Sequence, residues 1–346
     1  MNSTTTTLDV GRAPGLLSRR SAYDWLFALA VIVGAGYAFS RYGAAMDVYE
    51  KAILVGAVPS MIALGWFWGP LRTLGLGVGA ATLLAIGLYA QHTDAFGADL
   101  AAGEQLFVMK YFLSSQSAIL WMGVLFVFST VFYWIGFAAR GDGVATAQRI
   151  GSGMAWAAVF MALVGTMVRW YESHQIAPDI GHIPVSNLYE VFVLFCWLTA
   201  LFYLWFEQHY RTRSLGAFVM LVVTAAVGFL LWYTVVREAQ EIQPLVPALQ
   251  SWWMKLHVPA NFIGYGTFAI AAMVAFAYLV KQHASANRWW QLAPLWLLGV
   301  VLCFEPLVFR AKAADGGSAY WAIYFGVAAL LVGGILAARR QIAARL

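Results

Sequence analysis

Histidines that lie close to tryptophans are the residues of this chain best suited to chemistry. In the stretch from Gln243 to Gly266, QPLVPALQSWWMKLHVPANFIGYG, His257 follows Trp252 and Trp253 and precedes a long apolar run. Neutral imidazole is an axial ligand of haem iron, and a porphyrin needs apolar and aromatic walls with one polar edge. On a helix, residues 253 and 257 share a face, so the Trp253 ring is expected to flank a ligand that His257 holds. Haem is therefore the first ligand to consider.

A membrane protein offers another explanation for the same residues. Trp252 and Trp253 are then members of the aromatic belt at the membrane surface, and His257 caps a membrane helix. Composition alone leaves both explanations open.

A second polar stretch, GHIPVSNLYE, runs from Gly181 to Glu190. Asn187 is expected to cap a helix, with Glu190 three residues later as in a capping box. That expectation does not explain Gly181, His182 or Tyr189. Three histidines lie near aromatic residues in the sequence: His174, His182 and His257. The other three are expected to be solvated near helix ends: His92, His209 and His283.

Composition sets the class of protein that must position these residues. The chain has 346 residues, of which 62% are hydrophobic and 11% charged, and its mean hydropathy is +0.72. One soluble core cannot bury this much apolar surface, so an integral membrane protein is predicted. A bilayer core about 30 Å thick needs roughly 20 apolar residues per helix. Ten stretches come close to that requirement: 23–39, 52–68, 73–90, 117–138, 152–168, 188–206, 215–233, 256–280, 292–309 and 319–337. The predicted fold is all-α, a polytopic transmembrane helix bundle of about ten spans.

Charge predicts the orientation of the bundle. With the N-terminus in the cytoplasm, the cytoplasmic segments hold 13 of the 21 Lys and Arg residues, so the positive-inside rule places both termini there. Residues 1–22 and 338–346 are then cytoplasmic tails, and residues 23–337 form the bundle. The long loops 91–116, 169–187 and 234–255 are external, which makes the external face the working face. The net charge of +5 follows from this bias and does not indicate nucleic acid.

Other residues carry weaker signals. Cys196 and Cys303 lie in apolar segments, and neither CxxC nor CxxCH occurs, so we expect neither a dithiol relay nor covalently attached haem. Glu305 lies inside a predicted span near its external end, where it can reach water or pair with Arg310.

The two polar stretches together resemble a known family. GHIPVSNLYEVFVLFCW at 181–197 and LVPALQSWWMKLHVPANFIGYG at 245–266 are similar to the paired signatures of the CcsA/ResC family, called CcsB in several proteobacteria. These are the haem-handling membrane subunits of the system II cytochrome c synthase. The resemblance implies that His257 is an axial ligand of external haem. His182, which matches the histidine of the family's GHxP motif, is expected to contact the cofactor as well, together with Trp252 and Trp253.

The resemblance also implies a cofactor, partners and a location. The cofactor is haem b, bound transiently and without a covalent bond, and the membrane is the inner (plasma) membrane. A ResB-type membrane partner helps to bring haem across the bilayer, and apocytochrome c thiols then add to the haem vinyl groups. The chain supplies orientation and axial ligation, and no residue is expected to act as a general acid or base. Lys255, Arg237 or Arg169 are expected to pair with the haem propionates, an expectation that rests on charge and side alone.

One departure from the family bears on the haem site. Family members have a tryptophan-rich external loop that ends in a WDPKE-like sequence, followed by two further histidines, and nothing similar follows Ala337. The chain is therefore expected to be a fragment, or a truncated protein whose second axial ligand comes from elsewhere. Two other functions stay open: a multipass transporter, which would need ionisable residues near helix centres, and a scaffold for the ResB-type partner without a complete haem site.

Overall fold

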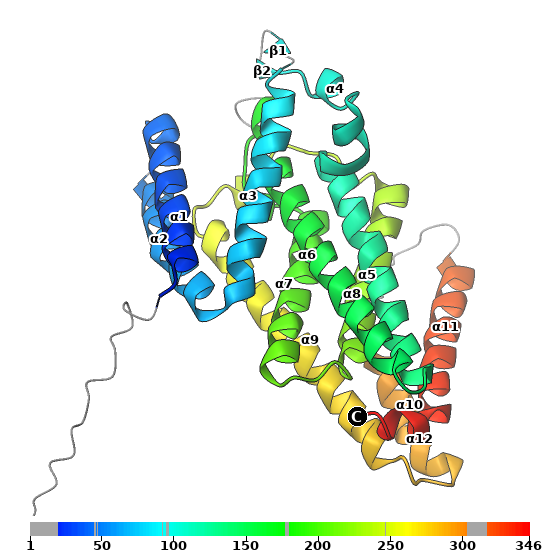
Figure 1. The fold of residues 1–346 in the computed structure, drawn as a ribbon. Helices are drawn as coiled ribbons and strands as arrows, with labels where there is room; N and C mark the ends of the chain where they lie inside the picture. The colour runs from blue at the N-terminus through cyan, green and yellow to red at the C-terminus, as the bar shows by residue number, and fades with distance from the viewer. Residues whose placement is uncertain are drawn as a thin grey trace, which may run out of the picture. The chain divides into compact units, whose positions relative to one another are not determined.

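The computed structural model describes residues 20–44, 46, 48–91, 93–94, 97–176, 180–245, 247–302 and 317–346. Every predicted apolar stretch lies in a helix over the described residues (Figure 1). Among the described residues, eight helices are long and apolar enough to cross a membrane, and two further apolar helices are shorter. The prediction of an all-α polytopic bundle is confirmed.

The chain divides into two compact units, residues 1–80 and 81–346. The first unit contains α1 (Ala22–Tyr42), α2 (Val48–Phe67) and the first part of α3 (Gly69–Tyr89). Ser21 and Asp24 form a capping box at the start of α1, and the Asp24 carboxylate also pairs with Arg72. The acidic residue that interrupts the first apolar stretch thus caps a helix and pairs with a cation.

The second unit carries the histidines of interest. Its elements are the rest of α3, β1 (Thr93–Asp94), β2 (Gly97–Ala98), α4 (Leu100–Gly103), the π-helical turn η1 (Met109–Leu113), α5 (Ser115–Ala138), α6 (Gly143–Ile176), α7 (Leu188–His209), α8 (Gly216–Arg237), the 3₁₀ turn η2 (Pro247–Leu249), α9 (Met254–Gln282), α10 (Trp289–Leu302), α11 (Gly317–Ala337) and α12 (Arg339–Ala343). The strands form a two-stranded antiparallel hairpin in which residues 93 and 98 are partners.

The core of this unit is the bundle of α5, α6, α7 and α8, with α9 packed against α7 and α8. Small residues let α6 approach α5 closely, as expected where lipid supplies no hydrophobic driving force between helices. A Cβ atom on Gly165 would lie 2.8 Å from Ile119 Cγ1. The buried small residues of α6 recur about once per turn: Ala147, Gly151, Ala155, Ala158, Ala162 and Gly165.

Helix α6 is longer than the bilayer requires. Its 34 residues span about 51 Å, against a hydrocarbon core of about 30 Å. It therefore continues through residues 169–176, the beginning of the segment predicted as an external loop. Its buried polar residues lie towards its two ends, with Ser152 at one and Arg169, Glu172 and Ser173 at the other.

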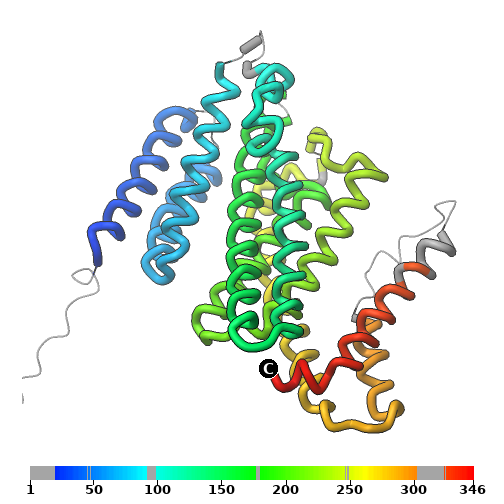
Figure 2. The backbone as a smooth tube through the Cα atoms, turned by 45° about the vertical axis from the view of Figure 1, so that its right-hand side comes forward, coloured from blue at the N-terminus to red at the C-terminus, as the bar shows by residue number. Residues whose placement is uncertain are grey.

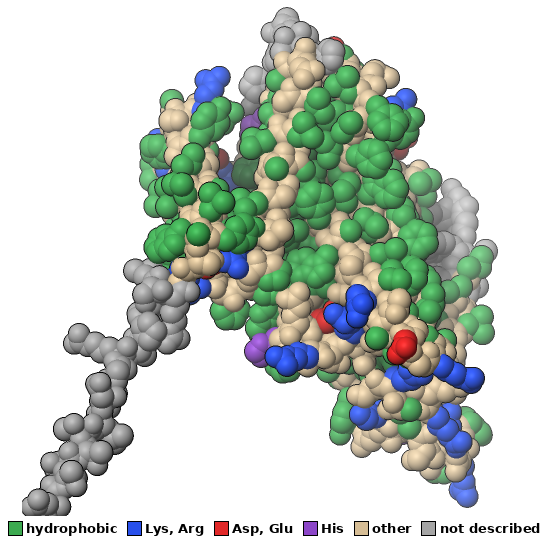
Figure 3. Space-filling model, viewed as in Figure 1, with side chains coloured by type: hydrophobic (Ala, Val, Ile, Leu, Met, Phe, Trp, Pro, Cys, Tyr) green, Lys and Arg blue, Asp and Glu red, His purple; other side chains and the backbone are tan. Residues whose placement is uncertain are grey.

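At the Ser152 end, the last residues of the chain return to the bundle. Helices α10 and α11 form a hairpin beside the α5–α8 bundle, and α12 leads back towards it (Figure 2). The Ser214 hydroxyl donates to the Arg345 carbonyl at 2.8 Å, and Arg345 Nη2 donates to the Ala139 carbonyl at 2.6 Å. Lys and Arg side chains gather at this end of the second unit, below a wide apolar surface (Figure 3).

Candidate functional site

His257 is exposed in the first turn of α9, directly after the two tryptophans. The Trp253 ring lies beside the imidazole, with ring centroids 6.4 Å apart and planes at 22°. Trp252 meets Trp253 edge-on at 5.3 Å, and Trp253 is itself 55% exposed. The predicted neighbourhood of residues 253 and 257 is therefore present. If His257 held a haem, the Trp253 ring beside it would help to orient the imidazole.

The two motifs pack against each other through one apolar cluster. Its buried members are Val185, Leu194, Leu198 and Met254, and its partly buried members include Ile183, Val191, Leu245, Leu249, Val258 and Phe262. Segments 183–198 and 245–262 are thus joined around the first two turns of α9, where His257 lies.

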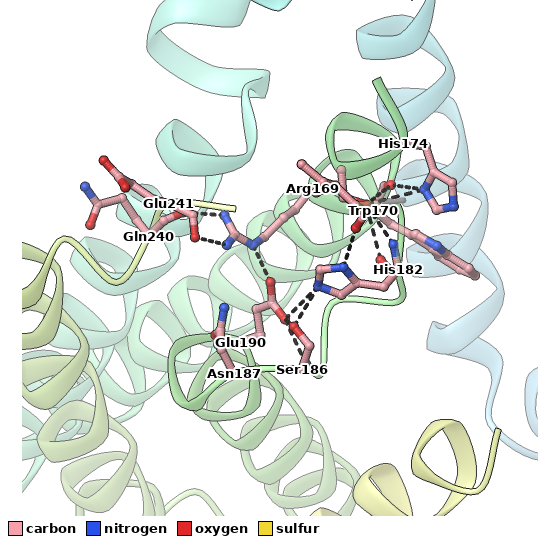
Figure 4. A network of polar contacts seen from close by, with 11 residues as sticks. Arg169, Trp170, His174, His182, Ser186, Asn187, Glu190, Gln240 and Glu241 are labelled. Atoms are coloured by element: carbon pink, nitrogen blue, oxygen red, sulfur yellow. Dashed lines mark hydrogen bonds and ion pairs between the residues drawn. The ribbon is translucent and has the colours of Figure 1, made fainter. Parts of the chain in front are cut away.

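A buried ion pair holds the same end of the bundle together (Figure 4). Arg169 Nε donates to Glu190 Oε1 at 2.8 Å, and both side chains are 2% exposed. The other guanidinium nitrogens donate to the carbonyls of Gln240 at 2.6 Å and Glu241 at 3.3 Å. Arg169 therefore links α6, the start of α7 and the segment that follows α8.

His182 is part of this network. Its Nδ1 lies 2.5 Å from the Ile180 carbonyl and its Nε2 lies 2.6 Å from Ser186 Oγ. The Ser186 backbone and hydroxyl both donate to Glu190 Oε2, at 2.9 and 2.7 Å. Both ring nitrogens of His182 thus have partners, and its side chain is 7% exposed.

Two features of the second motif have local explanations. The Asn187 side chain accepts from the Glu190 amide at 2.8 Å and caps α7, as predicted, while the Glu190 carboxylate turns to Ser186 and Arg169. At Gly181, a Cβ atom would overlap the imidazole of His174. A larger residue at this position would force the exposed imidazole of His174 to move.

The space inside this network is small. A cavity of about 10 Å³ lies beside the Arg169–Glu190 pair and is bounded by Thr166, Pro184 and Tyr189. That volume holds about one water molecule, whereas ligand pockets measure roughly 300–1,000 Å³. This cavity is therefore too small for a porphyrin, whereas His257 is exposed on the surface at this end.

A second carboxylate is buried nearby on α6. Glu172 Oε1 accepts from the Tyr89 hydroxyl at 2.8 Å and from the Ser115 amide at 3.0 Å. Partial burial raises the pKa of Glu104, and the neighbouring Glu172 carboxylate raises it further, while a hydrogen bond to Tyr89 lowers it. This group ties the segment after β2 to α3, α5 and α6.

The opposite end of α7 repeats some of these ingredients. Glu207 Oε2 accepts from the hydroxyls of Tyr133 at 2.5 Å and Tyr203 at 3.0 Å. Its Oε1 accepts from Ser152 at 2.6 Å and from Arg213 at 3.1 Å. Beside it, His209 is exposed and stacks on Trp205 at 4.8 Å and 12°, the same four-residue spacing as Trp253 and His257.

The basic residues proposed for propionates differ in their exposure to solvent. The prediction for Arg169 is wrong, because Glu190 and two carbonyls occupy its buried guanidinium. Arg237 is exposed in the last turn of α8 and Lys255 is half-buried in the first turn of α9. Glu305, Arg310, Cys303 and His92 lie outside the described residues.

Three residues of the site were missed in the sequence. Ser186 and Glu172 gave no local signal, since their partners come from distant segments. Asn261 was accessible to sequence reasoning, because it follows His257 by one helical turn; its Nδ2 lies 2.9 Å from His257 Nε2.

The residues at this end fit a haem more closely than a bare metal ion. Within the described residues, no group of three or more His, Cys, Asp and Glu side chains is arranged to hold a metal ion. A haem needs only one or two axial ligands from the protein and an apolar surface. The exposed imidazole of His257, beside exposed indole and above an apolar cluster, meets that requirement for one ligand.

Comparisons with known proteins agree with the motifs. The family model described as cytochrome C assembly protein matches residues 185–303. The cytochrome c biogenesis protein CcsA of Chlorella vulgaris is 30% identical over 60% of this chain and 61% of its own length. The CcsA proteins of Trichormus variabilis and Cyanophora paradoxa are 34% and 37% identical, over 45% and 29% of this chain and 42% and 31% of their own lengths. No solved structure matches.

The chain thus spans about three fifths of the Chlorella protein and a smaller share of the other two. The matched region contains the apolar cluster from Val185 onward, Glu190, and the first turns of α9 with His257. Residues 185–303 of this chain are thus similar to the cytochrome C assembly protein family and to the CcsA proteins.

Proposed function

We propose that this chain handles haem for cytochrome c biogenesis, holding haem b through His257 and presenting it for attachment to apocytochrome c. One observation carries the proposal. Two motifs separated by a complete membrane helix fold into one apolar cluster that leaves the imidazole of His257 exposed at a helix start. The cytochrome c biogenesis relatives support the same role.

The proposal assigns a different task to each polar residue. Haem supplies the iron and the vinyl groups to which thiols add. His257 would supply a nitrogen ligand to the iron, and Trp253 would orient its imidazole. The network of Arg169, Glu190 and Ser186 with His182 positions the loops around His257. In this proposal His182 holds those loops in place and does not bind the haem iron. Arg237 and Lys255 are the candidates for the propionates.

The surroundings follow from the same role. A ResB-type membrane protein is the proposed partner, in the inner (plasma) membrane. The end of the bundle with His257 faces the external or periplasmic side, and both termini are cytoplasmic. The distribution of Lys and Arg, which gather at the opposite end of the second unit, supports this orientation.

Haem absorption of the purified chain tests the proposal. Expressed with and without a ResB-type partner, the chain is expected to show a haem Soret band that His257→Ala abolishes. His209→Ala is the matched control, because His209 also stacks on a tryptophan four residues earlier and is exposed. It should leave the band unchanged. A band that survives His257→Ala contradicts the proposal. Retention of the partner without any haem band favours the scaffold, and solute uptake without haem favours a transporter.

A further inference from the structure

The nitrogen of His257 that an iron ion would use already has a partner. Asn261 Nδ2 lies 2.9 Å from His257 Nε2 on the same exposed face of α9. An amide nitrogen only donates hydrogen bonds, so Nε2 must accept, and the ring hydrogen is then on Nδ1. The Nε2 lone pair is the one that an axial ligand gives to iron, and it cannot serve the amide and the metal at once. An amide turned over to present its oxygen would block Nε2 as well.

The imidazole is held from both neighbouring turns of its helix. Trp253 lies on one side, four residues before, and Asn261 on the other, four residues after. Asparagine is a poor helix former, and an amide exposed in an apolar span is costly without a partner. Within the described residues, the Asn261 side chain has its hydrogen-bond partner in His257.

We propose that Asn261 is a positioning residue that competes with haem iron for Nε2 of His257. Without iron, the amide fixes the imidazole in the tautomer whose Nε2 is unprotonated, so no proton has to leave when iron binds. With iron, the amide must turn away, and the lost hydrogen bond weakens the hold on haem. A protein that delivers haem gains from a ligand that is both ready to bind and easy to release. This inference rests on the proposed role of His257.

The tautomer is measured first, because it does not depend on haem. The full-length chain is labelled with ¹⁵N-histidine in detergent, and the His257 signal is identified by its loss in His257→Ala. The expected spectrum shows protonated Nδ1 and hydrogen-bonded, unprotonated Nε2. Asn261→Ala should mix the two tautomers. Thr267→Ala is the control, since within the described residues that exposed hydroxyl bonds to carbonyls of its own helix. A His257 spectrum unchanged by Asn261→Ala would overturn the inference.

Titration with ferric haem measures the competition. Asn261→Ala and the similarly sized Asn261→Leu are expected to bind haem about 2- to 10-fold more tightly, the range that one exchanged hydrogen bond gives. The gain should vanish in a His257→Ala background. Unchanged or weaker haem binding by both variants, with binding still dependent on His257, overturns the competition alone. Binding that His257→Ala leaves intact overturns the proposed function and, with it, the competition.

Discussion

The two ends of α7 contain similar residues, but these residues have different partners. Each end has a buried glutamate with an arginine partner, and near each lies an exposed histidine stacked on a tryptophan. Glu190 and Glu207 are 17 residues apart, about 26 Å along the helix and close to the thickness of a bilayer core. The two buried carboxylates therefore lie near the two surfaces of the membrane.

The partners of the two glutamates differ. Glu207 receives three hydroxyls from α5, α6 and α7, and its arginine, Arg213, has a side chain that is 43% exposed. Glu190 is paired with Arg169, which is 2% exposed and also binds loop carbonyls. One carboxylate fastens helices to each other, whereas the other fixes loops beside a candidate ligand. The two ends therefore share residue types but differ in the partners of their buried carboxylates.

Removing the buried arginine should have the largest effect. Arg169→Met leaves Glu190 without its cation in a buried site, and a broken buried pair costs about 3–5 kcal/mol. Unfolding of the detergent-solubilised chain, followed by tryptophan fluorescence, measures the loss. The matched variant Arg213→Met removes a half-exposed cation from Glu207 and should cost at most about 1 kcal/mol.

A double variant separates the pair from the general loss of an arginine. Arg169→Met with Glu190→Leu removes both charges and should recover much of the stability lost by Arg169→Met alone. Equal losses for Arg169→Met and Arg213→Met would remove the distinction between the two ends.

Removing the hydroxyls around Glu207 should have an intermediate effect. Tyr133→Phe and Tyr203→Phe keep the rings but each deletes a donor to a buried carboxylate. Hydrogen bonds to charged groups contribute about 1.5–3 kcal/mol, so each variant should lower the free energy of unfolding by that amount. Haem absorption is the second readout and should not change. A change in haem absorption without a change in stability would show that this end also serves the ligand.

The smallest effect concerns the pH dependence at the His257 end. Since the pKa of Glu104 is raised in the folded chain, its contribution to stability is complete below the ordinary glutamate pKa and is lost as pH rises through the folded value. Glu104→Gln should therefore match the parent chain in acid and exceed it slightly at neutral pH. Melting curves across this range test the prediction, and in a Glu172→Gln background the difference should be smaller. A parent chain that gains stability relative to Glu104→Gln as pH rises would contradict it.

The sequence predicted the helices and the pair of Trp253 and His257 for physical reasons. A membrane span is recognised in the sequence as a long apolar run. Side chains four residues apart on a helix are neighbours, as Trp253 and His257 are. The partner of Glu190 was not accessible in this way. Arg169 is 21 positions earlier, in a segment that appeared to be loop because α6 continues beyond the apolar run. Tertiary contacts between distant segments, such as Tyr89 with Glu172, leave no spacing rule to detect.

The bonds from Arg169 to the carbonyls of Gln240 and Glu241 have a consequence for which sequence changes this segment tolerates. Because the Arg169 guanidinium donates to main-chain oxygens, these bonds do not depend on the side chains of residues 240 and 241. Substitutions between Glu238 and Glu241 therefore preserve the contact, whereas an insertion or deletion shifts the carbonyls out of reach. Glu238 itself turns the chain there with a φ of 50°. We therefore expect this segment to tolerate substitutions more readily than changes in its length.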